Sequence, residues 1–90
     1  DLDLTIKVLL EDLYQTVNGL SLSSKQRKKG LLASVESALA WFEKNRTDQI
    51  VRKLNKLQND IDRHVASELT TEELENINKQ IDELLLLLQS

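Results

Sequence analysis

The side chains able to carry out chemistry are few in this chain of 90 residues. It has one histidine, His64, and no cysteine. Asp60 precedes His64 by four residues, so both lie on about the same face of a helix, but two side chains supply at most a fragment of a metal site. We therefore expect no metal and no cofactor, and a His64 at the boundary of the core with a hydrogen-bond partner. A pH-sensitive contact and a metal ligand are the alternatives for this residue.

Catalysis by serine or carboxylate side chains is not expected either. The serines have no histidine arranged to activate them, and the chain has no glycine-rich phosphate loop. Glu72, Glu73 and Glu75 decorate the predicted start of a helix, where acidic side chains stabilise the helix dipole. The sequence therefore predicts a protein that is not an enzyme and has no catalytic residues.

Trp41 is the first candidate for a contact with a partner. It falls to one side of the apolar series of its predicted helix, so its indole is expected near the surface. An exposed tryptophan anchors sugars or protein partners, whereas one at the rim of the core would lie over a neighbouring helix near Tyr14. Both interpretations stay open.

A cluster of four cations is the second candidate. Lys25, Arg27, Lys28 and Lys29 crowd the first turns of a predicted helix, where positive charge is unfavourable. One interpretation is a solvated first turn that frays. The other is a binding site for an acidic partner or an anionic polymer. Gly30 follows them inside the same helix at a cost of about 1 kcal/mol relative to alanine, and we expect it to admit a close neighbour.

A run of five leucines near the C-terminus is the third candidate. Leu84 to Leu88 cover more of a helix than one buried stripe requires. Leu86 and Leu87 are left over, and we expect them to contact chain beyond this segment or a second copy.

The elements that position these residues follow from apolar residues at steps of three and four, which is the period of amphipathic helices. Four such series occur: Ile6, Leu9, Leu13 and Val17; Leu32, Val35, Leu39 and Phe42; Ile50, Leu54, Leu57, Ile61 and Val65; and Leu74, Ile77, Ile81, Leu84 and Leu88. Each stripe needs a partner surface to leave water, so the four segments should share a core.

Polar residues at the breaks predict the helix ends. We expect a first helix from about 3 to 18, with Gly19 as a left-handed stop residue, and a second helix from an N-cap at Ser23 to about 44, with Asn45 as a left-handed cap. A third helix should run from a cap at Thr47 or Asn45 to about 66. A fourth helix should begin at 71. The last helix follows a capping box of Thr70 and Glu73, which Leu69 and Leu74 flank as a hydrophobic staple.

Short connections force neighbouring helices to run antiparallel. We therefore predict an all-α fold, a small antiparallel up-and-down four-helix bundle in which an N-terminal helix packs on a three-helix core. Residues 1–90 form a single domain in this interpretation. Because the chain opens on Asp1 without a methionine, we expect it to be a fragment of a larger protein.

The amino-acid composition limits the classes of partner that we expect for the chain. Twelve Lys and Arg against fifteen Asp and Glu give a net charge of −3, which argues against nucleic-acid binding. No apolar run approaches the roughly 20 residues that a membrane-spanning helix needs.

Residues of the middle and last helices carry a family pattern. Leu54, Leu57 and Ile61 occupy core positions of a leucine-rich helix, and Leu69-Thr70 with Glu72-Glu73 begin the last helix; Glu43-Lys44-Asn45 form the middle turn, and Leu32, Ala38 and Leu39 belong to the second helix. Over roughly residues 10–85 this pattern resembles the FIMAH domain, a small helical module. Departures are Leu57 for an aromatic residue, Gln58 for an apolar one, and Leu74 and Ile81 for alanines.

The resemblance implies a non-catalytic accessory module of secreted or cell-surface bacterial and archaeal proteins. We therefore expect a spacer, docking or self-association element in a larger extracellular protein, whose partner is a neighbouring domain or a second copy. The alternative is a cytoplasmic adaptor or regulatory bundle that binds a partner helix through Trp41 or the C-terminal leucines. A further alternative, a carbohydrate-binding accessory module, rests on Trp41 and the basic cluster alone.

Overall fold

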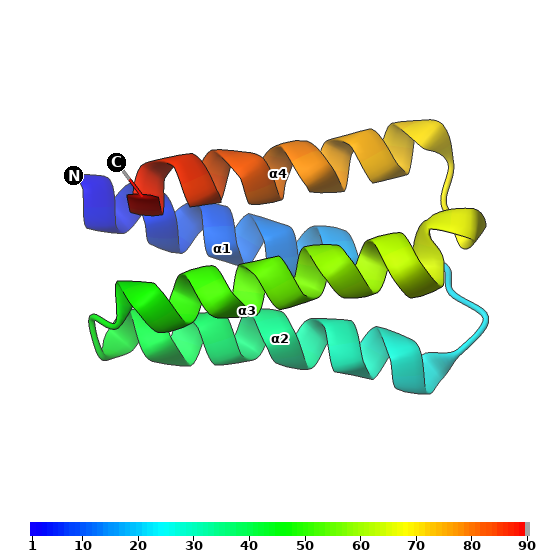
Figure 1. Cartoon of the computed structure of the whole chain (residues 1–90), viewed down its shortest axis with the longest axis horizontal. Coiled ribbons are helices and arrows are strands. Elements are labelled where there is room, and N and C mark those ends of the chain that lie inside the picture. The colour runs from blue at the N-terminus through cyan, green and yellow to red at the C-terminus, as the bar shows by residue number, and fades with distance from the viewer. Residues whose placement is uncertain (90) are drawn as a thin grey trace.

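Four α-helices make up most of residues 1–89, and the predicted all-α antiparallel bundle is confirmed. The computed structural model describes residues 1–89. Its helices are α1 (Leu2–Asn18), α2 (Lys25–Glu43), α3 (Thr47–Asp60) and α4 (Thr71–Gln89). Each helix runs antiparallel to the one before it, and α1 lies against both α2 and α4, so that the N- and C-terminal ends meet at one end of the bundle (Figure 1).

The core is built almost wholly from aliphatic side chains of all four helices. Its buried members are Ile6, Leu10, Leu13, Val17, Leu20, Leu31, Val35, Ala38, Ile50, Leu54, Leu57, Ile61, Val65, Ile77, Ile81 and Leu84. The five residues predicted for the third series are all among them. Burying one leucine or isoleucine side chain stabilises the fold by about 1.5 to 3 kcal/mol, so this shared core is the main source of stability.

The orientation of α2 differs from the prediction. Its buried residues are Leu31, Ser34, Val35 and Ala38, while the predicted Leu32, Leu39 and Phe42 are half-buried beside the core. Burial of the Ser34 hydroxyl on this face is tolerated because the hydroxyl donates locally to the Gly30 carbonyl oxygen at 3.4 Å. In α1, Leu10 is likewise fully buried, whereas the predicted Leu9 is half-buried.

The connection between α1 and α2 departs from the prediction at both ends. Gly19 has a φ of −82°, not a left-handed value, since the chain continues a right-handed turn in which the Leu20 N–H donates to the Val17 carbonyl oxygen. This turn buries Leu20 in the core. The N-cap of α2 is Ser24, not Ser23: the Ser24 hydroxyl accepts from the Arg27 N–H at 3.1 Å.

The connection between α2 and α3 confirms Asn45 as a left-handed residue, with a φ of 57°. The predicted cap of α3 at Thr47 or Asn45 is wrong, because Arg46 occupies the N-cap position and provides no side-chain cap. The Arg46 guanidinium instead contacts both carboxylate oxygens of Asp48, at 3.1 and 3.2 Å. This pair places a carboxylate in the first turn of α3, as predicted, where it stabilises the helix dipole.

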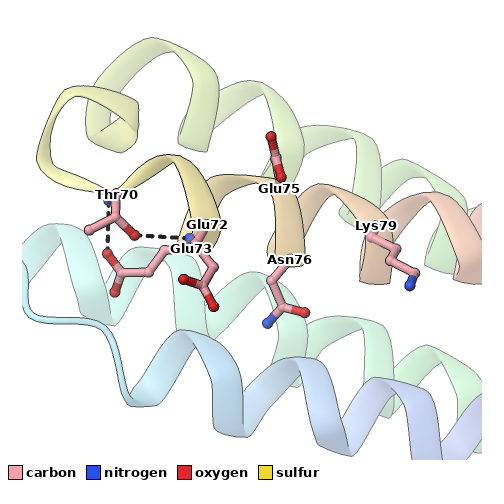
Figure 2. A pocket seen from close by; sticks show the side chains of 6 residues that line it. All are labelled: Thr70, Glu72, Glu73, Glu75, Asn76 and Lys79. Carbon is pink, nitrogen blue, oxygen red and sulfur yellow. Dashed lines mark hydrogen bonds between the residues drawn. The ribbon is translucent and has the colours of Figure 1, made fainter.

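The connection between α3 and α4 contains the predicted capping box. The Thr70 N–H donates to Glu73 Oε1 at 2.9 Å, and the Glu73 N–H donates to Thr70 Oγ1 at 3.0 Å (Figure 2). Helix α4 begins at Thr71 as predicted. Before it, helical structure continues past α3 to about the predicted end, but as a π-helical turn, η1 (Ile61–Val65), and a 3₁₀ turn, η2 (Ala66–Glu68).

Gly30 does not have the close neighbour that we expected, because a Cβ built on it would find nothing within 4 Å. Replacing Gly30 with alanine should therefore raise the free energy of unfolding by about 1 kcal/mol, through the smaller loss of backbone entropy in a helix interior. Chemical denaturation followed by circular dichroism measures this change. Unchanged or reduced stability would show that the glycine is required by the fold.

Glu68 connects the loop between α1 and α2 to the segment between α3 and α4 through a hydrogen bond. The Ser23 N–H donates to Glu68 Oε1 at 2.8 Å, and this bond is the main reason that the pKa of Glu68 lies below its ordinary value. A lowered folded-state pKa means that the stabilisation is present above the unfolded pKa and disappears as the pH falls through the folded value.

We therefore expect Glu68→Gln to be less stable than the parent chain at pH 7, because glutamine is a neutral and weaker acceptor. The two proteins should converge in stability once the pH falls well below about 4.3, the ordinary pKa of glutamate. Denaturation midpoints measured from pH 7 to pH 3 test this convergence. A difference that is the same at every pH would contradict the assigned bond.

Candidate functional site

His64 is exposed, which contradicts its expected place at the core boundary with a hydrogen-bond partner. It lies in η1, and its side chain has no hydrogen bond within residues 1–89. Asp60, the side chain expected to face it, accepts instead from the Lys56 ammonium at 3.2 Å. Among residues 1–89, no three His, Cys, Asp or Glu side chains are grouped so that they could hold a metal ion.

Trp41 is half-buried and packs against the core from its rim. The Lys44 ammonium lies 5.3 Å from the centre of the indole ring, and the Arg46 guanidinium lies 5.7 Å from it. Tyr14, expected nearby, donates to Glu36 Oε1 at 3.2 Å. A cation over an aromatic face contributes about 0.5 to 1 kcal/mol at an exposed site, so the two cations stabilise this position of the indole weakly.

The basic cluster of Lys25, Arg27, Lys28 and Lys29 lies at the surface in the first turns of α2. In the part of the chain that the structure describes, the ion pairs involve other cations, namely Lys7, Arg46 and Lys56. None of the four cations forms an ion pair within residues 1–89, although the Arg27 charge is close enough to Glu68 to help lower the pKa of that carboxyl group. Arg27 differs from the other three because it lines a depression between α2 and α3.

That depression brings together residues that the sequence did not connect. Its lining residues are Arg27, Gly30, Leu31, Lys56, Asp60 and His64, and its volume is about 250 Å³. We call it the Gly30 groove. No pattern in the sequence pairs residue 27 with residue 64, because their proximity depends on how α2 and the end of α3 are set against each other.

The two spare leucines of α4 have different environments. Leu86 is 71% exposed, as expected, while Leu87 is half-buried against the core. Three apolar residues of α1 that we did not single out are also exposed, namely Leu2 (52%), Leu4 (61%) and Val8 (45%). The signal for two of them was their spacing, since Leu4 and Val8 lie one turn apart and outside the buried series.

These four exposed side chains occupy the same end of the bundle. Leu2, Leu4 and Val8 lie in the first two turns of α1, and Leu86 lies in the last turn of α4. The two helix ends lie side by side where the N- and C-terminal ends meet (Figure 1). We call these four residues the terminal apolar group. A single exposed leucine is ordinary, and what these four side chains share is the end of the bundle at which they lie.

A further depression, of about 460 Å³, follows the start of α4 and is lined by Thr70, Glu72, Glu73, Glu75, Asn76 and Lys79. Glu73 turns back to the capping box, while Glu75, Asn76 and Lys79 point in different directions along the helix (Figure 2). The side chains do not converge on a common point, as the groups of a catalytic site do.

Comparison of the chain with models of protein families, with curated proteins and with solved structures finds no match. Within residues 1–89, no helix is long and apolar enough to cross a membrane.

Proposed function

We propose that this chain is a non-catalytic helical module that acts by docking, and that a second copy of the same chain is the partner. The observation that carries the proposal is the terminal apolar group, in which four aliphatic side chains are about half exposed or more at one end of the bundle. Removing such side chains from water favours association in proportion to the apolar area covered.

The small size of the terminal apolar group determines how strong we expect the self-association to be. Association must first offset the loss of rotational and translational freedom, and four side chains per copy exceed that cost by only a little. The self-association is therefore weak and depends on protein concentration. Weak contacts of this kind are useful where many copies stand close together, since proximity raises their effective concentration.

Sedimentation equilibrium over a wide range of protein concentration tests the proposal. The parent chain should show a mass that rises with concentration, and the double variant Leu4→Glu/Leu86→Glu should remain a monomer. The matched control is Ala33→Glu/Ala40→Glu, which introduces the same charge at two exposed positions of α2.

A strict monomer at the highest concentration of the parent chain would overturn self-association. Equal loss of association in both double variants would also count against the terminal apolar group, because net charge would then be the cause.

We also propose, on the resemblance to the FIMAH domain alone, that the module belongs to a larger secreted or cell-surface protein. The full-length reading frame tests this part separately. An export signal and a further domain in that frame would support it, and a cytoplasmic protein with no other domain would contradict it.

A further inference from the structure

Three locally unfavourable features coincide at the end of the bundle opposite the terminal apolar group. Helix α2 begins with a basic cluster and has no acidic residue in its first turn. Gly30 lies in the interior of the same helix with open space beside it. Opposite them, the end of α3 gives way to the π-helical turn η1. Cations at a helix start, an interior glycine and a π turn each cost stability or regularity.

No contact within the fold explains Gly30, because no neighbour approaches it. Proteins that break local rules without a gain in packing do so most often at functional sites. The glycine has one visible consequence, which is that it leaves space in the Gly30 groove. Because Gly30 lines the groove, we expect a larger side chain at this position to occupy part of it.

The groove is lined by hydrogen-bond donors from three elements, of which Arg27 and Lys56 are cations. Arg27 comes from α2, Lys56 from α3, and His64 from η1. Asp60 is the acidic member of the lining, and its contact with the Lys56 ammonium at 3.2 Å balances its charge. The Arg27 guanidinium and the His64 imidazole form no ion pair among residues 1–89, and the nearest carboxylate influence on Arg27 is the electrostatic interaction with Glu68.

We infer that the Gly30 groove binds a phosphate group. A guanidinium fork matches two oxygens of a tetrahedral oxyanion, and an ammonium and an imidazole supply further donors. Asp60 favours phosphate over sulfate as the ligand, because a phosphate that carries a proton donates a hydrogen bond to a carboxylate, whereas sulfate has no proton to donate. The groove volume of about 250 Å³ leaves room for a group attached to the phosphate. This site is independent of the proposed self-association.

Titration of the isotope-labelled chain with inorganic phosphate, followed by amide NMR shifts at constant ionic strength, tests the inference. The expected result is a saturable shift of the amides of Gly30 and of η1, with weaker effects from inorganic sulfate. Methyl phosphate, run as a parallel titration, separates the free ion from an ester: equal or tighter binding indicates an ester as the natural ligand, and much weaker binding indicates the free ion.

Variants locate the site. Arg27→Gln and His64→Gln should each weaken phosphate binding by roughly tenfold, the effect of losing one charge-assisted hydrogen bond. Lys29→Gln is the matched control, since it removes one exposed cation of the same helix that does not line the groove, and it should change the affinity by less than about twofold. Gly30→Leu should block binding in a protein at least as stable as the parent, because leucine favours helix and fills the groove.

Three results would overturn the inference. The first is an amide shift that does not saturate as phosphate is added. The second is an equal loss of phosphate affinity in Arg27→Gln and Lys29→Gln. The third is full phosphate affinity in a folded Gly30→Leu variant. Sulfate binding as tight as phosphate binding would overturn the assignment of the ligand as phosphate.

Discussion

Replacing Leu57 with alanine is expected to lower the free energy of unfolding by about 2 to 5 kcal/mol. Leu57 is completely buried in the last turn of α3 and belongs to the core shared by all four helices. Truncation removes its apolar contacts and leaves a cavity that the surrounding helices fill only in part. In a small domain, whose total stability is about 5 to 15 kcal/mol, this loss is enough to shift the folding equilibrium visibly.

The matched control is Leu86→Ala, which makes the same chemical change at a side chain that is 71% exposed. Its effect on the monomer should stay within about 0.5 kcal/mol. Urea denaturation of both variants, at a concentration too low for self-association, gives the comparison. Similar losses at the two positions would mean that Leu57 does not lie in a closed core.

Replacing Ala38 with leucine is expected to lower the stability by about 1 to 3 kcal/mol, because the extra atoms have no room. Ala38 is completely buried on the inner face of α2. The same change at Ala40, which is exposed on the same helix, should be nearly neutral. Thermal or urea denaturation of the pair therefore measures which face of α2 turns inward.

The opposite outcome is equally informative. The apolar series Leu32, Val35, Leu39 and Phe42 places Ala38 away from the centre of the buried stripe. A tolerated Ala38→Leu, together with a severe loss in Leu39→Ala, would support that series over the observed orientation of α2.

The third and fourth helices were predictable because their signals agree with one another. Large aliphatic residues mark the buried face of α3 and of the η1 turn that continues it, without a competing stripe, and all five predicted members are buried. The start of α4 was predictable because a capping box is a local motif, whose two hydrogen bonds require residues only three positions apart.

The orientation of α2 was not predictable by the same reasoning. Its inner face carries Ser34 and Ala38, which have low apolar content, while larger residues lie on its flank. A search for large apolar residues therefore chooses the flank. The small residues are favoured at the centre by the available space, which depends on the neighbouring helices and not on α2 alone.

For the candidate surfaces, too, the sequence revealed local features and could not reveal features that depend on tertiary contacts. Leu86 was identified because a run of five leucines exceeds what one stripe requires, but the half-burial of Leu87 depends on tertiary contacts. The Gly30 groove joins residues 27 and 64, which only the pairing of two helices brings together. Sequence patterns identified Arg27 and His64 separately and could not relate them.

The most direct test of the central claim, one core shared by four helices, is the pattern of nuclear Overhauser effects between methyl groups of the isotope-labelled chain. The structure predicts contacts that connect the buried methyl groups of α1 to those of both α2 and α4, and those of α3 to both α2 and α4. Methyl groups of α1 without contacts to α4, or a core confined to three helices, would contradict it.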